Sequence, residues 1–185
     1  MDWMTFLSLL EEFNMVSVIV RIFLAMLLGG LIGMEREKSR RPAGFRTHIL
    51  VAVGSCLFML VSLSMPRIID SMMPHGIVNN ADPGRIAAQV VSGIGFLGAG
   101  AILQSKRRVI GLTTAASLWA VAAVGLAVGA GLYLTAAVAT LLTFIILTWF
   151  SKLEDQIDLL VQKEKEEKEC GECAPVECEA EETCK

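Results

Sequence analysis

One uncharged stretch constrains this chain more than any other feature of its sequence. From Val109 to Ser151 there is no charged residue in 43 positions. As a single helix rising about 1.5 Å per residue, the stretch would reach roughly 65 Å, about twice the hydrocarbon thickness of a bilayer. It must therefore fold back, and Gly129-Ala130-Gly131 is the expected turn. The stretch predicts two membrane spans, at 112–128 and 132–150.

Three further segments are long and apolar enough to cross a bilayer, which takes about 20 helical residues. They lie at 16–34, which contains only the charge of Arg21, at 47–65, which contains none if His48 is neutral, and at 86–103, which contains none. The chain as a whole is 54% hydrophobic and only 19% charged, and its mean hydropathy is +0.60. We therefore expect an all-α, polytopic membrane bundle of about five transmembrane helices.

The charges divide the chain into two regions. Residues 1–151 carry 11 Lys and Arg against 7 Asp and Glu, whereas residues 152–185 carry 5 against 12. We expect a transmembrane domain over 1–151 and a charged, cysteine-containing tail over 152–185 that is disordered beyond 163. The composition excludes a disulfide-stapled miniprotein, and it argues against a nucleic-acid partner, which would need more than short basic clusters.

Basic residues predict the orientation in the membrane. Five Lys and Arg lie between positions 36 and 46 and three lie at 106–108, whereas the N-terminal stretch holds none and the loop after the second span holds only Arg67 and Arg85. By the positive-inside rule, the N-terminus is outside, and both basic loops and the C-terminal tail are cytoplasmic.

Small residues recur at helical spacing in several spans. Since helices in lipid associate by close packing, such residues mark contact faces. The predicted helix-packing residues are Gly29, Gly30, Gly33, Gly93, Gly95, Gly98, Gly100, Ala116 and Ala120. Residues 93–98 also match the dinucleotide fingerprint G-x-G-x-x-G, but they lie inside an uncharged span, where the fingerprint's strand and acidic residue have no place. Helix contact, or a break in the helix at membrane depth, is the preferred interpretation.

Six polar residues are candidates for a polar site or cavity: Glu35, Arg36, Arg46, Asp82, Arg85 and Gln89. Asp82-Pro83 has the pattern of a helix N-terminus, and Arg85 and Gln89 follow on one face. Asp82 could therefore cap the helix, stand at the mouth of a cavity, or do both. Separately, the oxygens of the outer loop could bind a hard cation such as Mg²⁺.

Buried charges need partners or a route to the interface. We expect Arg21 to reach the outer interface and Glu35 or Arg36 to pair with Arg46 or another residue of the basic loops. No Ser-His-Asp arrangement, H-E-x-x-H or Walker sequence occurs, so an enzyme is not expected and no cofactor is required.

Four cysteines of the tail, Cys170, Cys173, Cys178 and Cys184, follow a C-x₂-C-x₄-C-x₅-C pattern. Four thiols this close in a reducing cytosol favour a soft metal such as Zn²⁺ over disulfides. Structural zinc sites usually have paired ligands and a surrounding fold, so an unstructured tail is the competing interpretation.

Five blocks of sequence, taken together, point to a known family. They are GGLIGMERE at 29–37, AGFRTH at 43–48, DPGR at 82–85, GIGFLGAG at 93–100 and GLTTAASLW at 111–119. Their order and combination resemble the MgtC/SapB membrane proteins of bacteria. The resemblance implies a multi-pass protein of the cytoplasmic membrane with about five spans. It also implies an association with growth in low magnesium and, in pathogens, with survival inside host cells.

The same resemblance leaves two functions to weigh. Members were named as magnesium transporters, whereas the best-known branch is associated with regulation of other membrane machinery, including the proton-driven ATP synthase. The 34 residues after Ser151 are expected to be too few and too charged for that branch's folded C-terminal domain. We expect a non-catalytic regulator with a membrane-protein partner or a second copy of itself. The alternative is a small-ion carrier for Mg²⁺ or another cation.

Overall fold

The first two helices of the described residues form an antiparallel pair joined by a short connection. The computed structural model describes residues 15–72, 82, 84–105 and 108–150. Helix α2 covers Met15–Lys38 and helix α3 covers Phe45–Met72. In the connection, the Glu37 carboxylate accepts a hydrogen bond from the Phe45 backbone N–H at 3.1 Å. Because the first N–H groups of a helix have no partner within it, this bond stabilises the start of α3.

Helix α4 leads into a feature that the sequence analysis did not predict. It covers Gly84–Ala101, and Asp82 accepts a hydrogen bond from the Gly84 N–H at 2.8 Å beside its first turn. Strands β1, Leu103–Ser105, and β2, Arg108–Ile110, then pair in antiparallel fashion, with Leu103 opposite Ile110. A small hairpin therefore stands where a plain basic loop was expected.

Two glycines in the left-handed conformation direct the chain into and out of helix α5. Helix α5 covers Leu112–Gly129 and begins after Gly111, whose φ is 98°. A side chain on Gly111 would collide with the Ala101 carbonyl oxygen, so only glycine fits this junction. Gly131, with φ of 86°, then reverses the chain into helix α6, Tyr133–Ile145.

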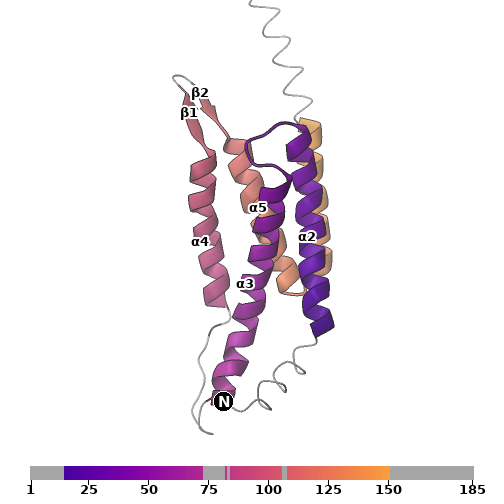
Figure 1. Ribbon diagram of the computed structural model, residues 1–185, viewed down its shortest axis with the longest axis vertical. Coiled ribbons are helices and arrows are strands. Elements are labelled where there is room, and N and C mark those ends of the chain that lie inside the picture. Colours follow the sequence, from indigo (N-terminus) through magenta and orange to yellow (C-terminus); the bar gives the residue numbers. More distant parts are fainter. Residues whose placement is uncertain (1–14, 73–81, 83, 106–107, 151–185) are drawn as a thin grey trace, which may run out of the picture. The chain divides into compact units, whose positions relative to one another are not determined.

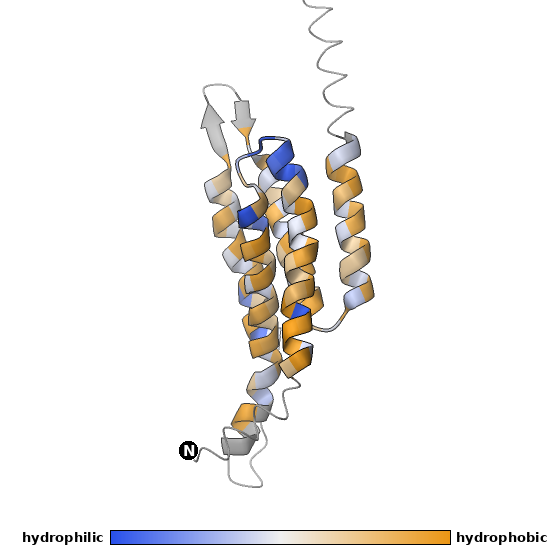
Figure 2. Ribbon diagram, turned by 45° about the vertical axis from the view of Figure 1, so that its right-hand side comes forward, coloured by the Kyte–Doolittle hydropathy of each residue, from blue (hydrophilic) through white to orange (hydrophobic). Residues whose placement is uncertain are grey.

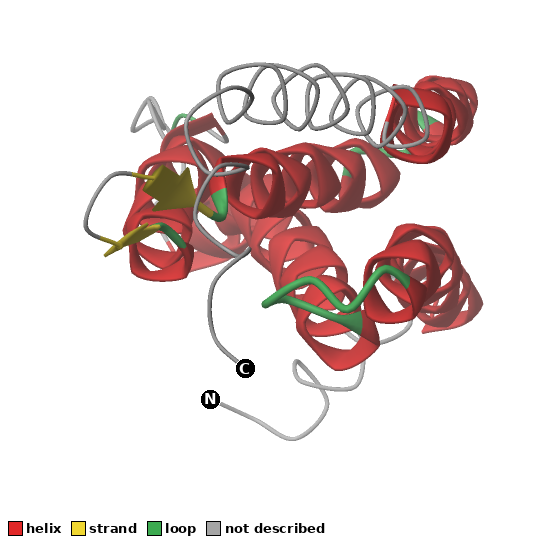
Figure 3. Ribbon diagram, turned by 90° about the horizontal axis from the view of Figure 1, so that it is seen from above, coloured by secondary structure: helices red, strands yellow, loops and turns green. Residues whose placement is uncertain are grey.

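Helices α3 and α5 hold the bundle together, since each contacts α2 and α4 and the two contact one another. Figures 1 and 3 show these helices running alongside one another. One core cluster joins α2, α3, α5 and α6 through residues such as Ala25, Cys56, Val124 and Ala136.

The chain divides into two compact units after residue 144. The described part of the second unit contains a single π-helical turn, η1, Ile146–Phe150.

The outer surface of the described helices is apolar. Phe96 is 83% exposed and Leu134 is 80% exposed, and large hydrophobic side chains are exposed on every helix. Figure 2 shows apolar residues along the helices and hydrophilic residues at the α2–α3 connection. So much exposed apolar surface is compatible with lipid and not with water.

The prediction of an all-α membrane bundle is therefore confirmed. The described residues form five α-helices, with the β1–β2 hairpin and the η1 turn added. Three helical segments are long and apolar enough to cross a membrane: α2, the Phe45–Pro66 part of α3, and α5. Arg85 and Gln89 lower the hydropathy of α4, and the apolar helix at Tyr133–Trp149 is shorter. That these two also cross stays a prediction.

Candidate functional site

A buried polar cluster links the start of α3 to the start of α5. The His48 side chain is fully buried, with Nδ1 2.9 Å from the Gly44 carbonyl oxygen and Nε2 3.0 Å from Ser117 Oγ. Ser117 Oγ also lies 2.8 Å from the Thr114 carbonyl oxygen. A carbonyl oxygen can only accept a hydrogen bond. When the His48 ring is neutral, its single N–H proton therefore lies on Nδ1 and is donated to the Gly44 carbonyl. In that state the single hydroxyl proton of Ser117 is donated to Nε2 in place of the Thr114 carbonyl.

The same geometry accommodates a protonated His48 ring if the Ser117 hydroxyl rotates. If Nε2 gains a proton it becomes a donor, and Ser117 can accept from it while donating to the Thr114 carbonyl. Sequence reasoning placed His48 within a span and assigned it no partner. The AGFRTH block contains the histidine, but nothing in that block indicates a serine 69 positions later.

Two of the six predicted polar residues meet at the end of α2. Arg36 is only 1% exposed, and its Nε pairs with the Glu35 carboxylate, which also accepts a hydrogen bond from Ser39 Oγ at 2.8 Å. Arg46 is exposed and borders an open pocket beside Glu37. Within the described residues, Glu35 therefore pairs with its sequence neighbour and not with Arg46.

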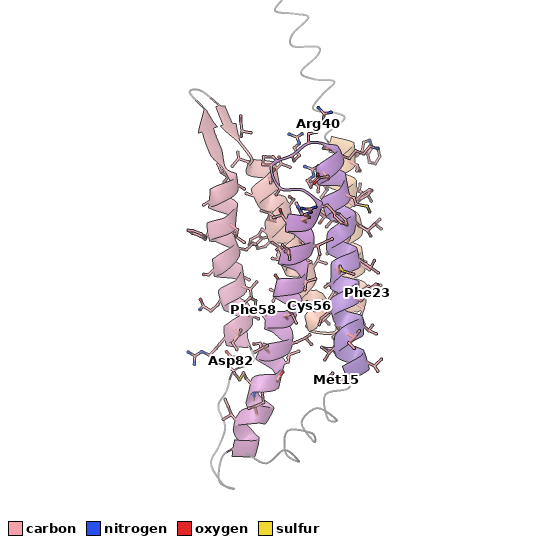
Figure 4. The ribbon with its side chains drawn as sticks, in the orientation of Figure 1. Met15, Phe23, Arg40, Cys56, Phe58 and Asp82 are labelled. Carbon is pink, nitrogen blue, oxygen red and sulfur yellow. The ribbon has the colours of Figure 1, made fainter. Side chains whose placement is uncertain are left out.

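The other three predicted polar residues lie at the N-terminal end of α4, Asp82 just before the helix and Arg85 and Gln89 in its first turns. Asp82, Arg85 and Gln89 border one pocket of about 550 Å³. In Figure 4, Arg40 of the α2–α3 connection and Asp82 are labelled at opposite ends of the bundle. The six candidates thus form two separate groups and not one cavity.

Arg21 is half-buried and binds the turn between α5 and α6. Its Nη1 donates to the Gly129 carbonyl oxygen at 2.8 Å and its Nε donates to the Tyr133 hydroxyl at 3.1 Å. Gly129 is the last residue of α5, so its carbonyl is one of the groups that lack a partner within the helix. A cation there also interacts favourably with the negative end of the helix dipole.

Glycines bring α2 and α5 close to the backbone of α3. A Cβ added to Gly29 would lie 2.6 Å from Ala52 Cβ, and one added to Gly129 would lie 2.7 Å from the Cys56 carbonyl oxygen. Gly125 is as tightly placed, against the Ala52 carbonyl. Sequence reasoning listed Gly29 but omitted Gly125 and Gly129, although their four-residue spacing was visible.

The remaining small residues that were predicted to pack lie in varied surroundings. Gly30 and Gly33 face α3, and Gly98 lies near Ala115 of α5. An added Cβ at Gly93, Gly95 or Gly100 would meet nothing within 4 Å, Ala116 is exposed and Ala120 is half-buried.

Metal ligands do not gather in the part of the chain that the structure describes. No group of three or more His, Cys, Asp or Glu side chains is placed there to hold an ion. The tail cysteines Cys170, Cys173, Cys178 and Cys184 lie outside the described residues. The zinc prediction for the tail therefore stays a prediction.

Together, the apolar exterior, the three long apolar helices and the glycine contacts define a helical membrane protein. Comparison with known proteins then identifies the family. The MgtC family model matches residues 22–156, so the chain belongs to the MgtC family.

Several curated bacterial proteins are similar to this chain. "Putative magnesium transporter YhiD" of Escherichia coli K12 is 44% identical over 135 residues, which cover 73% of this chain and 61% of that protein. "Protein MgtC" of Salmonella typhimurium LT2 is 46% identical over 132 residues, covering 71% and 52%. An uncharacterized protein of Haemophilus influenzae is 44% identical over 126 residues, covering 68% and 52%. The match thus spans roughly half to three fifths of these relatives. No solved structure shows significant similarity to the chain.

Proposed function

We propose that this protein is a multi-pass protein of the bacterial cytoplasmic membrane that acts in the response to magnesium limitation. In this proposal it is not an enzyme, requires no cofactor and regulates other membrane machinery through a protein partner. Membership of the MgtC family supports the setting in a membrane. The name of the E. coli relative, a putative magnesium transporter, supports the link to magnesium.

The observation that supports the regulatory role is that the buried polar groups are fully hydrogen-bonded. Within the described residues, every buried side-chain nitrogen or oxygen has a hydrogen-bond partner. His48 bonds Ser117, while Ser64 and Thr140 bond carbonyls of their own helices. A carrier needs polar groups that are free to replace the hydration shell of an ion at membrane depth. Satisfied pairs are better suited to hold helices in place.

A small-ion carrier is the second candidate, and one observation favours it. The E. coli relative is named as a putative magnesium transporter. In this alternative, the Glu35–Arg36 pair and the Asp82–Arg85–Gln89 group would serve as the two polar ends of a route. The route would have to open between them, because the two groups are separate in the described structure.

Ion flux distinguishes the two candidates. We expect purified protein in liposomes to give no Mg²⁺ or K⁺ flux above protein-free liposomes. A flux that is abolished by Asp82→Ala, and retained by the capping-competent Asp82→Asn, would establish the carrier and exclude a purely regulatory role.

The link to magnesium has its own test. A strain that lacks the gene should grow as the parent does in millimolar Mg²⁺ and more slowly in micromolar Mg²⁺, and a plasmid copy should restore its growth. Equal growth of the two strains at both concentrations would remove the link to magnesium.

A further inference from the structure

An apolar groove runs between α3 and α4, which contact one another less extensively than α3 contacts α2 or α5. Its volume is about 580 Å³, within the range typical of small-molecule sites. Gly54 of α3 and Gly93 of α4 both line it, and a Cβ on either would meet nothing within 4 Å. Leu50 and Phe58 at its edge are 71% and 55% exposed. The groove is thus empty of protein and open to the side.

The length of the groove matches one leaflet of a bilayer. It extends from Thr47 to Phe58 along α3 and from Ile86 to Leu97 along α4. At 1.5 Å per residue, each of these stretches is about 16 Å long, close to half of the roughly 30 Å hydrocarbon core. An acyl chain lying along the two helices would fill such a groove, whereas a crossing helix would need about twice that length.

The groove meets a polar pocket at each end. At one end it shares Thr47 with a pocket bordered by Glu37 and Arg46, and at the other end it meets the pocket at the start of α4. That pocket, of about 550 Å³, shares Ile86 and Gln89 with the groove and is bordered by Asp82 and Arg85. Asp82 uses one carboxylate oxygen to accept from the Gly84 N–H. Within the described residues, neither Asp82 nor Arg85 forms an ion pair. One negative and one positive group therefore stand together at the mouth of an apolar groove.

We propose that this groove binds a phospholipid whose headgroup carries both a phosphate and a primary ammonium group. Arg85 binds the phosphate, Asp82 accepts from the ammonium group, and the Gln89 amide donates to an ester carbonyl, while one acyl chain lies against Gly54 and Gly93. An anionic headgroup without the ammonium would leave Asp82 next to like charge. A quaternary choline would have no N–H to donate to it. By the predicted topology, the Asp82 end of the groove faces the outside.

Native mass spectrometry of the full chain, released from nanodiscs of defined composition, tests the proposal. Wild-type protein should retain phosphatidylethanolamine in preference to phosphatidylcholine and phosphatidylglycerol. The leucine side chain of Gly93→Leu should fill the groove and lower the affinity for the lipid, and with it lipid retention, about tenfold. Gly95→Leu is the matched control, because Gly95 is equally open but does not line the groove, and it should retain the lipid.

The headgroup is tested separately. Asp82→Asn keeps a side chain that can cap α4, so it should fold and lose only the preference for phosphatidylethanolamine over phosphatidylglycerol. Equal retention of all three lipids by the wild type, or undiminished retention by Gly93→Leu, would overturn the proposal. So would a Gly93→Leu variant that keeps its lipid but forms a smaller oligomer than the wild type does, since the groove would then belong to a second copy of the chain.

Discussion

His48 of α3 and Ser117 of α5 are joined by a hydrogen bond of 3.0 Å between Nε2 and Oγ, across 69 positions of sequence. Ser117→Ala removes the partner and leaves a buried ring nitrogen unsatisfied, which should lower the free energy of unfolding by about 1–3 kcal/mol. Unfolding in detergent, followed by circular dichroism, measures this.

The control for Ser117 is Thr143→Ala, which deletes only a bond to the carbonyl of Ala139 on the same helix and should cost about 0.5 kcal/mol or less. The double variant His48→Leu, Ser117→Ala removes both polar groups and should recover part of the lost stability. If Ser117→Ala and Thr143→Ala have equal effects, His48 does not depend on Ser117.

Arg21 should contribute more to stability than its tyrosine partner. Tyr133→Phe deletes one hydrogen bond and should cost about 0.5–1.5 kcal/mol, whereas Arg21→Met also removes the charged donor to the Gly129 carbonyl and should cost about 1.5–3 kcal/mol. Thermal unfolding of the two variants tests the order. Arg46→Met, at an exposed position, should change stability by less than about 0.5 kcal/mol. A smaller effect at Arg21 than at Tyr133 would contradict this interpretation.

Gly125 should tolerate no side chain. A Cβ there collides with the Ala52 carbonyl oxygen and lies 2.9 Å from Ser55 Cβ, so α3 and α5 would have to separate. Gly125→Ala should therefore lower stability by about 1–3 kcal/mol. Gly95→Ala meets open space and should leave stability unchanged or raise it, because alanine favours helix over glycine. Size-exclusion chromatography in detergent measures the folded fraction of each of the two variants. Equal folded fractions for Gly125→Ala and Gly95→Ala would show that the α3–α5 contact can relax.

The orientation in the membrane is a prediction from the basic residues alone. A phosphatase reporter fused after Lys185 should be inactive, and a fluorescent protein that matures only in the cytoplasm should be bright at the same position. The reverse pattern would invert the topology and place the Asp82 end of the groove on the inner side.

The helices could be predicted from the sequence because lipid excludes charge, and long uncharged stretches have few alternatives to a helix. The pairing of particular side chains could not. Spacing shows which small residues share a face of α5, but not how the helix is rotated, so Ala116 was listed although it is exposed, while Gly125 was missed. His48 and Ser117 meet only because two helices far apart in the chain cross at that level. The β1–β2 hairpin is too short for its residues to show a clear alternation.

The anchoring of Arg21 has a consequence for biosynthesis. Its partners, the Gly129 carbonyl and the Tyr133 hydroxyl, are 108 and 112 residues further along the chain. At about 5–20 residues per second, the ribosome needs roughly 5–20 seconds to reach them. During that interval the Arg21 guanidinium is without these two partners. The contacts of α2 are thus among the last to be completed, and synthesis of the α5–α6 turn sets the moment at which the bundle can close.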